Sequence, residues 1–331
     1  MASACGHIRI GLSGWLYPGW RGVFYPKGLR HRDELAYASR RVDTIEINGT
    51  FYSLQRPELF AAWRDTTPDD FIFAVKGGRF ITHMKRLKDV DSALANFFAS
   101  GVLALHEKLG PILWQLPPRF AFDEERLDGF LSLLPHDVDA AAELARHHDH
   151  RVAGRSLTFS HLHQKLRHAI EIRHTSFIDP AFIRLLRRHN VALVFSDAVD
   201  WPYAEDVTAD FVYLRLHGSQ ELYASGYDDN ELDRWAARIG HWAQGGAPDD
   251  ARLTDRSTVP RPQPRDVYVY FDNDAKVRAP VDAQALRLRF ASTPEEARSG
   301  TAVAVGVAHG TDKRLHETDD RHHPADKDAE H

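Results

Sequence analysis

Charged and polar residues stand at the ends of several short apolar stretches, where they could transfer protons or bind an anion. The candidate proton-transfer groups are Glu46, Glu171 and His217, because carboxylates and imidazoles can accept and release protons in a protein interior. The candidate substrate-binding groups carry an amide, a charge or an aromatic ring, and they are Asn48, Lys76, Gln115, Arg173, Asp197, Arg215, Asn273, Trp15 and Tyr17. Together they predict a site for a small anionic substrate, such as a phosphorylated sugar or a nucleotide-like compound.

Side-chain alternation indicates which of these residues meet. In the second apolar stretch Glu46 and Asn48 share one face of an extended chain, and the isoleucines between them share the other. The same alternation places Glu171 beside Arg173 in the fifth stretch and turns Arg215 inward in the seventh. We therefore expect two carboxylates and two guanidiniums to point into one interior.

Buried charge is costly unless it is paired or used. One interpretation is a scaffold, in which the glutamates and arginines pair only with each other and tie strands together. The other is a working site that binds anions or transfers protons. We favour the working site, because further polar and basic candidates stand at the ends of neighbouring stretches.

Eight apolar stretches with helical segments between most of them predict an α/β fold, a TIM-like (β/α)8 parallel barrel. The stretches are Ile8–Leu12, Asp43–Ile47, Phe71–Val75, Pro111–Trp114, Ala169–Ile172, Val191–Phe195, Phe211–Leu214 and Val267–Phe271. Functional groups of such barrels gather at the carboxyl ends of the strands, where the candidates stand. Residues 198–210 carry little helical signal, so we expect one barrel helix to be missing between strands 6 and 7.

Helix signals support this order. Asp123 and Asp179 are typical N-caps before helical patterns. A third pattern opens at Asp91 and runs to Gly110, and a fourth covers Asp229–Gln244. Residues 245–265 are rich in Pro, Asp and Arg, which predicts a flexible surface loop.

The chain of 331 residues divides into three expected parts. Residues 1–7 form an N-terminal extension, 8–290 form the barrel domain, and 291–331 form a polar tail. The tail lacks a sustained apolar pattern, so we expect it to be disordered.

Composition limits the partners and the location. The net charge is −5, from 42 Lys and Arg against 47 Asp and Glu, and does not indicate nucleic acid as a partner, although a local basic pocket remains compatible with it. A single cysteine, no recognisable leader and no apolar run near 20 residues predict a cytoplasmic protein without a membrane partner. The oligomeric state stays open.

Cofactor motifs for NAD, flavin or ATP are missing from the sequence. A divalent metal is an alternative, with five potential ligands: Glu46, Glu171, Asp197, His217 and Asp274. No short-spaced ligand pair supports it, and inward Arg173 and Arg215 would repel a cation. We therefore assign no metal ligands, and the cofactor stays unknown.

The segment after the first stretch is dense in aromatic residues. Trp15 and Tyr17 follow the strand end directly, and Trp20, Phe24 and Tyr25 come next. These rings could stack a sugar or base over the barrel mouth. Alternatively, the loop packs on itself as a lid.

Eight sequence blocks in consecutive order resemble the YecE-like family, the domain of unknown function seventy-two. They are GLSGWLYPGWRGVFYP (11–26), TIEINGTFY (44–52), FAVK (73–76), ITH (81–83), LGPILWQLPP (109–118), EIRH (171–174), FVYLRLHG (211–218) and YVYFDND (268–274). The resemblance covers roughly residues 8–290 and implies a TIM-like barrel with no established activity. Gly49 departs from it, since a small hydroxyl residue is expected there.

Function therefore has to be argued from the site. The leading hypothesis is an enzyme whose class, hydrolase, lyase or isomerase, is left open. The alternatives are a non-catalytic binding protein for an anionic metabolite or a nucleic-acid end, and a metal-dependent hydrolase or isomerase. An enzyme needs a group with a pKa near neutrality, whereas a binding protein needs only permanent charge.

Overall fold

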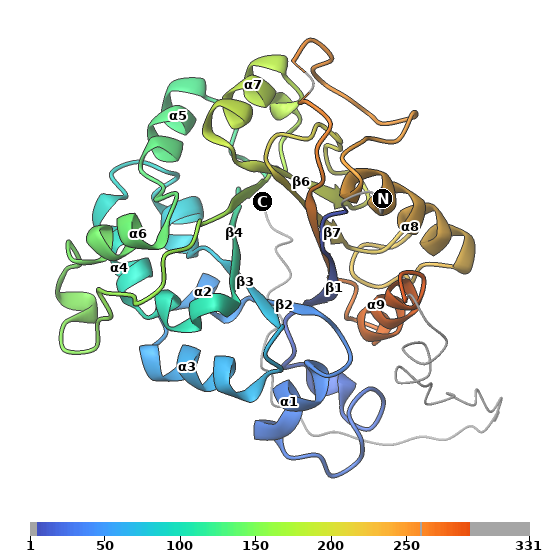
Figure 1. The fold of residues 1–331 in the computed structure, drawn as a ribbon, viewed down its shortest axis with the longest axis horizontal. Helices are drawn as coiled ribbons and strands as arrows, with labels where there is room; N and C mark the ends of the chain where they lie inside the picture. Colours follow the sequence, from blue (N-terminus) through green and yellow to red (C-terminus); the bar gives the residue numbers. More distant parts are fainter. Residues whose placement is uncertain (1–4, 259, 292–331) are drawn as a thin grey trace, which may run out of the picture. The chain divides into compact units, whose positions relative to one another are not determined.

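Eight parallel strands close into one barrel in the computed structural model, which describes residues 5–258 and 260–291. The strands are β1 Ile8–Ser13, β2 Thr44–Ile47, β3 Ile72–Lys76, β4 Leu109–Gln115, β5 His168–Glu171, β6 Ala192–Asp197, β7 Phe211–Leu216 and β8 Asp266–Phe271. They follow one another around the barrel in chain order, and β8 pairs with β1 (Figure 1). The TIM-like barrel expected from the sequence is confirmed.

Helices surround the strands in Figure 1. They are α1 Glu34–Ala38, α2 Gly49–Tyr52, α3 Pro57–Thr66, α4 Asp91–Ala99, α5 Glu124–Ser132, α6 Val138–Ala145, α7 Pro180–His189, α8 Asp229–Ala243 and α9 Arg278–Leu288. Asp123 and Asp179 cap α5 and α7 as expected, because their carboxylates accept backbone N–H groups of the first turn. Within the described part of the chain, every helix is too short or too polar to cross a bilayer.

The helical pattern that opens at Asp91 ends sooner than predicted. The helix α4 stops at Ala99, and Gly101 then adopts a left-handed φ of +116°. A Cβ on Gly101 would lie 2.5 Å from Cα of Pro57, so only glycine fits this close approach. Gly110, expected as the helix terminator, belongs to β4 instead.

The connection from β6 to β7 contains no helix, as predicted, and another segment covers it. The Asp206 carboxylate accepts the backbone N–H groups of Thr254 and Asp255, at 2.7 and 2.9 Å. Glu205 binds the backbone N–H of Arg252 in the same way, at 2.9 Å. The loop before β8, orange in Figure 1, is also tied to Arg187 of α7 through Asp255 and to Arg238 of α8 through Asp250. It is a loop as expected, and its flexibility stays a prediction.

Two apolar cores are present. The larger lies between the strands and the helices, and the smaller fills the barrel interior. Tyr213, Tyr268 and Tyr270 are among the large residues of this interior, where they lie together with small residues such as Ala74 and Ala169. This packing closes the barrel from below, so polar inward-facing side chains are left at its carboxyl end.

The outermost segments cannot be compared with the expectations for them. Residues 1–4 and 292–331 lie outside the described residues. The predicted disorder of the tail and the domain limits at 7 and 291 therefore stay predictions.

Candidate functional site

A layer of polar side chains covers the tyrosines at the carboxyl end of the barrel. Its members continue the inward-facing alternation of the strands and are Ser13, Glu46, Lys76, Gln115, Glu171, Ser196, Arg215 and Asp272. Five of them, including Lys76, are candidates from the sequence. The parallel register brings their strands to one mouth.

Arg215 lies at the centre of this layer and is only 1% exposed. Its Nη1 donates to Oε2 of Glu171 at 2.6 Å, and its Nη2 donates to Oε1 of Glu46 at 3.0 Å and to Oδ2 of Asp272 at 2.8 Å. Burial opposes the charge, but attraction to Glu171, Glu46 and Asp272 prevails and holds the pKa of Arg215 well above its ordinary value. One guanidinium thus binds carboxylates from three strand ends.

Both carboxylate oxygens of Glu46 are occupied. Oε1 accepts hydrogen bonds from Ser13 at 2.8 Å and from Arg215, and Oε2 accepts one from the Tyr213 hydroxyl at 2.6 Å. Asn48 joins the group, because its Nδ2 donates to Ser13 Oγ at 3.0 Å. These contacts fix the orientation of the Glu46 carboxylate.

Glu171 is equally enclosed. Its Oε1 accepts from Gln115 at 2.8 Å and from Nε of Arg173 at 3.1 Å, while Oε2 faces Arg215. Burial alone would raise the pKa of Glu171, but the charges of Arg215 and Arg173 outweigh it and hold that pKa well below its ordinary range. Glu171 therefore stays ionised at neutral pH.

His217 is buried beside Arg215, which donates from Nη1 to the imidazole Nε2 at 3.1 Å. Burial and then the charge of Arg215 lower the pKa of His217 well below its ordinary value, so the ring is neutral. With Nε2 as acceptor, the ring proton is assigned to Nδ1. The rings of Trp201 and Tyr223 lie 4.8 and 5.6 Å from the imidazole.

Arg173 combines an ion pair with an aromatic contact. Its guanidinium carbon lies 4.1 Å from the ring centroid of Trp201, and its Nε binds Glu171. The backbone is strained near the rings of Trp201 and Tyr223. Tyr223 has a φ of +63°, and Asp200, next to Trp201, has a φ of +66°. Left-handed non-glycine residues of this kind gather at functional sites.

Lys76 faces the same mouth with a different environment. Its Nζ lies 4.3 Å above the ring of Phe51, and it makes no hydrogen bond or ion pair with a described residue. Burial and then repulsion by Arg215 lower the pKa of Lys76 to about 8. An appreciable share of this lysine is thus uncharged near neutral pH.

Asp272 was missed by the sequence analysis, which chose Asn273 and Asp274. Alternation could have found it, because Tyr268, Tyr270 and Asp272 fall on one face of β8 and its continuation. Burial raises the pKa of Asp272 although Arg215 opposes the shift. Its side chain is 13% exposed, so it is the carboxylate of this cluster that solvent reaches.

Three candidates have their partners elsewhere. Asp197 accepts a hydrogen bond from the Tyr227 hydroxyl at 2.8 Å, close to the start of α8. Asn273 donates to Asp282 of α9 at 2.8 Å. Trp15 is buried and packs against α3. The structure therefore does not bring them into contact with Arg215.

Tyr17 borders the mouth, and the rest of its loop packs on itself. Its hydroxyl donates to the carbonyl of Ser13, and its ring lies 4.5 Å from that of Trp20. Burial, followed by the charges of Asp274 and Asp272, raises the pKa of Tyr17 well above its ordinary value. Trp20, in turn, contacts Phe24 and Tyr25, which matches the self-packed alternative for this loop.

Several buried polar atoms at the mouth have no partner among residues 5–258 and 260–291. They are Oδ1 of Asn48, Oγ of Ser196, Nδ1 of His217 and Nε of Arg215. Buried polar atoms are nearly always hydrogen-bonded in proteins. A ligand or water that enters the mouth would find one acceptor, two donors and one hydroxyl that can act as either.

The proposed metal ligands do not assemble. Among the residues that the structure describes, no three or more His, Cys, Asp or Glu side chains are arranged to hold an ion. Arg215 binds Glu46 and Glu171 at once, and Asp197 turns to Tyr227. The carboxylates thus surround a guanidinium rather than a metal position.

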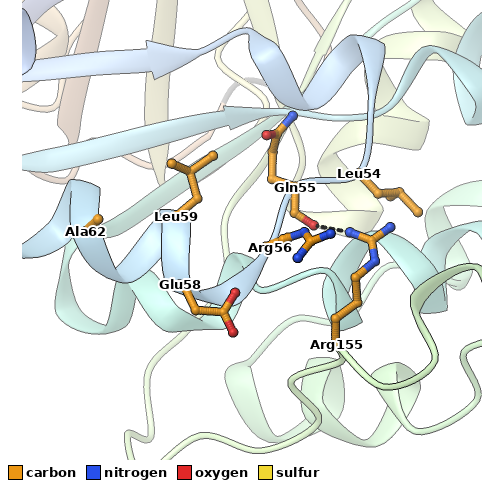
Figure 2. Close-up of a pocket in the computed structure, with 7 residues that line it drawn as sticks. All are labelled: Leu54, Gln55, Arg56, Glu58, Leu59, Ala62 and Arg155. Carbon is orange, nitrogen blue, oxygen red and sulfur yellow. Dashed lines mark hydrogen bonds between the residues drawn. The ribbon is translucent and has the colours of Figure 1, made fainter. Parts of the chain in front are cut away.

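A depression of about 470 Å³ lies outside this cluster (Figure 2). It is lined by Leu54, Gln55, Arg56, Glu58, Leu59, Ala62 and Arg155. Figure 2 shows Nη1 of Arg155 donating to the carbonyl of Gln55, at 2.9 Å. None of the candidate residues lines it, so the barrel mouth remains the candidate site.

Comparison with known proteins shows a matching family model and relatives of similar sequence. The sequence model described as "Protein of unknown function DUF72" matches residues 9–304. The UPF0759 protein YecE of Escherichia coli K12 is 27% identical over 247 residues, covering 73% of this chain and 84% of that protein. The UPF0759 protein YunF of Bacillus subtilis is 31% identical over 144 residues, 41% of this chain and 50% of that protein.

Solved structures of the same family share the fold. A DUF72 family protein from Thermotoga maritima superposes with a TM-score of 0.64 at 24% identity, over 85% of this chain and 98% of that one. A DUF72 family protein from Enterococcus faecalis gives 0.60 at 16% identity, over 85% and 94%. The resemblance read from the eight sequence blocks is confirmed, and the chain belongs to the DUF72 family of proteins of unknown function.

Proposed function

We propose that the barrel mouth is the active site of an enzyme that acts by acid–base catalysis on a small anionic substrate. One observation carries this proposal: Asp272 and Lys76 face the same mouth, and their pKa values are displaced from opposite sides towards neutrality. Proton transfer is most efficient when the pKa of the catalytic group lies near the working pH. Ion pairs that only tie strands together would not require a shifted pKa for Asp272 or for Lys76.

Asp272 is the best-suited acid–base group. It is partly open to solvent, whereas Glu46 and Glu171 are fully buried with each oxygen already bonded. We assign to the two glutamates a positioning role: they hold Arg215, and Arg215 holds the Asp272 carboxylate at 2.8 Å. We therefore assign proton transfer to Asp272 and not to Glu46 and Glu171, the carboxylates suggested by the sequence.

Anion binding falls to Arg173 and Lys76. The cluster contains three carboxylates, Glu46, Glu171 and Asp272, and three cationic side chains, Arg215, Arg173 and Lys76. Arg215 is committed to all three carboxylates, so it has little charge left for a ligand. The guanidinium carbon of Arg173 lies 4.1 Å from the Trp201 ring centroid, and this contact would hold the guanidinium in place to bind a phosphate or carboxylate.

Neutral contacts complete the proposed site. Nδ1 of His217 is a donor and Oδ1 of Asn48 an acceptor, and both lack a partner in the described part of the chain. They would bind hydroxyl or amide groups of the substrate and fix its orientation. The neutral imidazole suits this role, because its lowered pKa keeps it from exchanging a proton near pH 7.

Binding and turnover can be separated by two substitutions. In Arg173→Met we expect the apparent affinity for phosphate and sugar phosphates to fall at least tenfold. The affinity is obtained from the rise in melting temperature at millimolar anion concentrations. In Asp272→Asn we expect binding to persist while turnover, followed by NMR on a panel of sugar phosphates and nucleotides, drops by 10²–10⁴.

A matched control and the contrary result complete this experiment. Arg146→Met removes an exposed arginine of a surface pair with Glu143 and should change neither quantity. Anion binding without any turnover on the panel, and unaffected by Asp272→Asn, would favour the non-catalytic binding protein. No anion-dependent stabilisation of the wild type would reject the proposed function.

We also propose a cytoplasmic location. It is supported by the single cysteine, Cys5, which leaves the chain without a pair for an internal disulfide. Fractionation of cells that express a tagged full-length chain, with a periplasmic marker as control, tests it.

A further inference from the structure

Lys76 stands apart from the other charged groups at the mouth. Arg215 and Arg173 bind carboxylates, whereas the Lys76 ammonium group rests on the ring of Phe51 and forms no ion pair or hydrogen bond with any residue in the described ranges. The glutamates of the cluster are already bound to the arginines. The pKa of Lys76 is lowered by burial and by the charges of Arg215 and Arg173, and these effects outweigh the opposing charges of Glu46 and Glu171.

Lys108, which is buried, shows the contrast. Nζ of Lys108 donates to the carbonyls of Arg64 and Thr67 at 2.7 and 2.9 Å, at the carboxyl end of α3. That arrangement stabilises the charged form and ties a helix end, as a structural lysine does. Lys76 has none of these contacts, so a structural role of this kind does not account for its place at the mouth.

The surroundings of Lys76 keep its position fixed and accessible. Oγ1 of Thr50 donates to the Lys76 carbonyl at 2.6 Å, which holds the end of β3. Phe51 is buried and is backed by the ring of His83, 5.0 Å away. The lysine itself is partly exposed, so a ligand in the mouth can reach its nitrogen.

Such an amine is a nucleophile. A lysine becomes reactive when an apolar contact and a neighbouring cation favour its uncharged form. With a pKa of about 8 instead of 10.5, the neutral amine at pH 7 is on the order of a hundredfold more abundant than at an exposed lysine.

We propose that Lys76 forms a Schiff base with the carbonyl group of a small anionic aldehyde or ketone. The inference rests on the proposed function and deepens it, since it names the carbonyl as the reacting group and leaves the anion to Arg173. Lys76 then acts as a nucleophile rather than as a simple positive charge.

The reaction balances with groups on this chain. The neutral Lys76 amine adds to the carbonyl carbon, so a C–N bond forms as the C=O π bond breaks, and the oxygen takes a proton from the protonated form of Asp272. The nitrogen loses a proton to the Asp272 carboxylate. Asp272 then gives this proton to the hydroxyl, which leaves as water as the nitrogen lone pair forms the C=N bond. The products are a protonated imine and the Asp272 carboxylate.

Reductive trapping on the full-length wild-type protein tests the proposal. The probes are dihydroxyacetone phosphate and pyruvate, each added with sodium borohydride at pH 7 and mapped by peptide mass spectrometry. We expect one reduced adduct per chain, on Lys76, formed on the order of a hundredfold faster than on the exposed Lys85 and Lys88. Uncharged dihydroxyacetone should label Lys76 at least tenfold more slowly than its phosphate, because it lacks the group that Arg173 would hold.

Variants identify the reacting lysine. Lys76→Arg and Lys76→Met should lose the adduct, and Lys85→Met, a matched surface control on the same connection, should keep it. Labelling spread evenly over exposed lysines, or its survival in Lys76→Arg, would overturn the Schiff base. If phosphate still stabilises the wild type through Arg173 in that case, the proposed function stands and only this inference fails. If neither binding nor trapping occurs, both are rejected.

Discussion

Arg215 joins Asp272 through a hydrogen bond of 2.8 Å between Nη2 and Oδ2, and the same Nη2 also contacts Glu46 at 3.0 Å. Arg215 is 1% exposed, whereas the Asp272 side chain is 13% exposed. One guanidinium therefore links the buried layer of the barrel to the part of the mouth that solvent reaches. The ion pairs of Arg215 can therefore both tie the strands together and position Asp272, so the scaffold interpretation and the working-site interpretation do not exclude each other.

Replacing Arg215 with methionine should destabilise the protein by about 3–5 kcal/mol, because Glu46 loses its cation and Glu171 loses its shorter ion pair. Urea unfolding of the variant and the wild type measures the difference. Arg146→Met, which removes a guanidinium about 60% exposed, should change stability by no more than about 0.5 kcal/mol. A loss below about 1 kcal/mol for Arg215→Met would contradict a network that depends on this residue.

The stability of the wild type should depend on the charge state of Lys76. Its pKa is about 8 in the folded protein and 10.5 ordinarily, so between these pH values the unfolded chain binds more protons and stability rises with pH. Lys76→Met should remove this rise and stabilise the protein at pH 7 by about 1–2 kcal/mol. Unfolding curves from pH 7 to 10 measure it, and the difference between the two proteins isolates Lys76 from other titrating groups. Parallel curves for both would disprove the assignment.

Asp206 should hold the loop that replaces the missing helix. In Asp206→Ala the N–H groups of Thr254 and Asp255 lose their acceptor, which should cost about 1–3 kcal/mol. Hydrogen exchange of residues 250–258 should accelerate in the same variant. Asp249→Ala, an exposed substitution in the same loop, is the control and should leave both measurements unchanged. Unaltered exchange in Asp206→Ala would mean that other contacts hold the loop.

Two glycines should respond in opposite ways to alanine. Gly101→Ala adds a Cβ at a left-handed φ, 2.5 Å from Cα of Pro57, and should destabilise the protein by about 2–4 kcal/mol. Gly129 lies within α5 with open space around its Cα, so Gly129→Ala should stabilise by about 0.5–1 kcal/mol. Thermal melts of both variants test this, and a neutral Gly101→Ala would show that the chain can shift away from Pro57.

The barrel could be predicted because its signals are local. The inward-facing alternation of Glu46 with Asn48 needs only the two-residue period of an extended chain, and the caps at Asp123 and Asp179 need only a carboxylate before a helical pattern. Each of these features depends on residues a few positions apart. They appear at the expected places in the structure.

Local reasoning could not predict which residue after the end of β8 faces the mouth. Asn273 and Asp274 follow β8 just as Asp272 does, but a shift of one residue turns a side chain to the opposite face. Asp272 meets Arg215, while Asn273 meets Asp282 in α9. The sequence placed polar groups at this strand end, and the exact end of the pleated segment decided which of them faces the mouth.

Contacts between distant segments were decided by the tertiary structure alone. Trp201 lies against Arg173, and Asp206 binds a loop about 48 residues further along the chain, although no local pattern relates these positions. Lys76 reads as an ordinary strand-end cation in the sequence, and its lowered pKa follows from Phe51 and Arg215, which other elements bring beside it. The sequence by itself determined the strands and their inward faces, because backbone periodicity is local. The chemistry of the mouth depends on burial and on charges that only the closed barrel brings together.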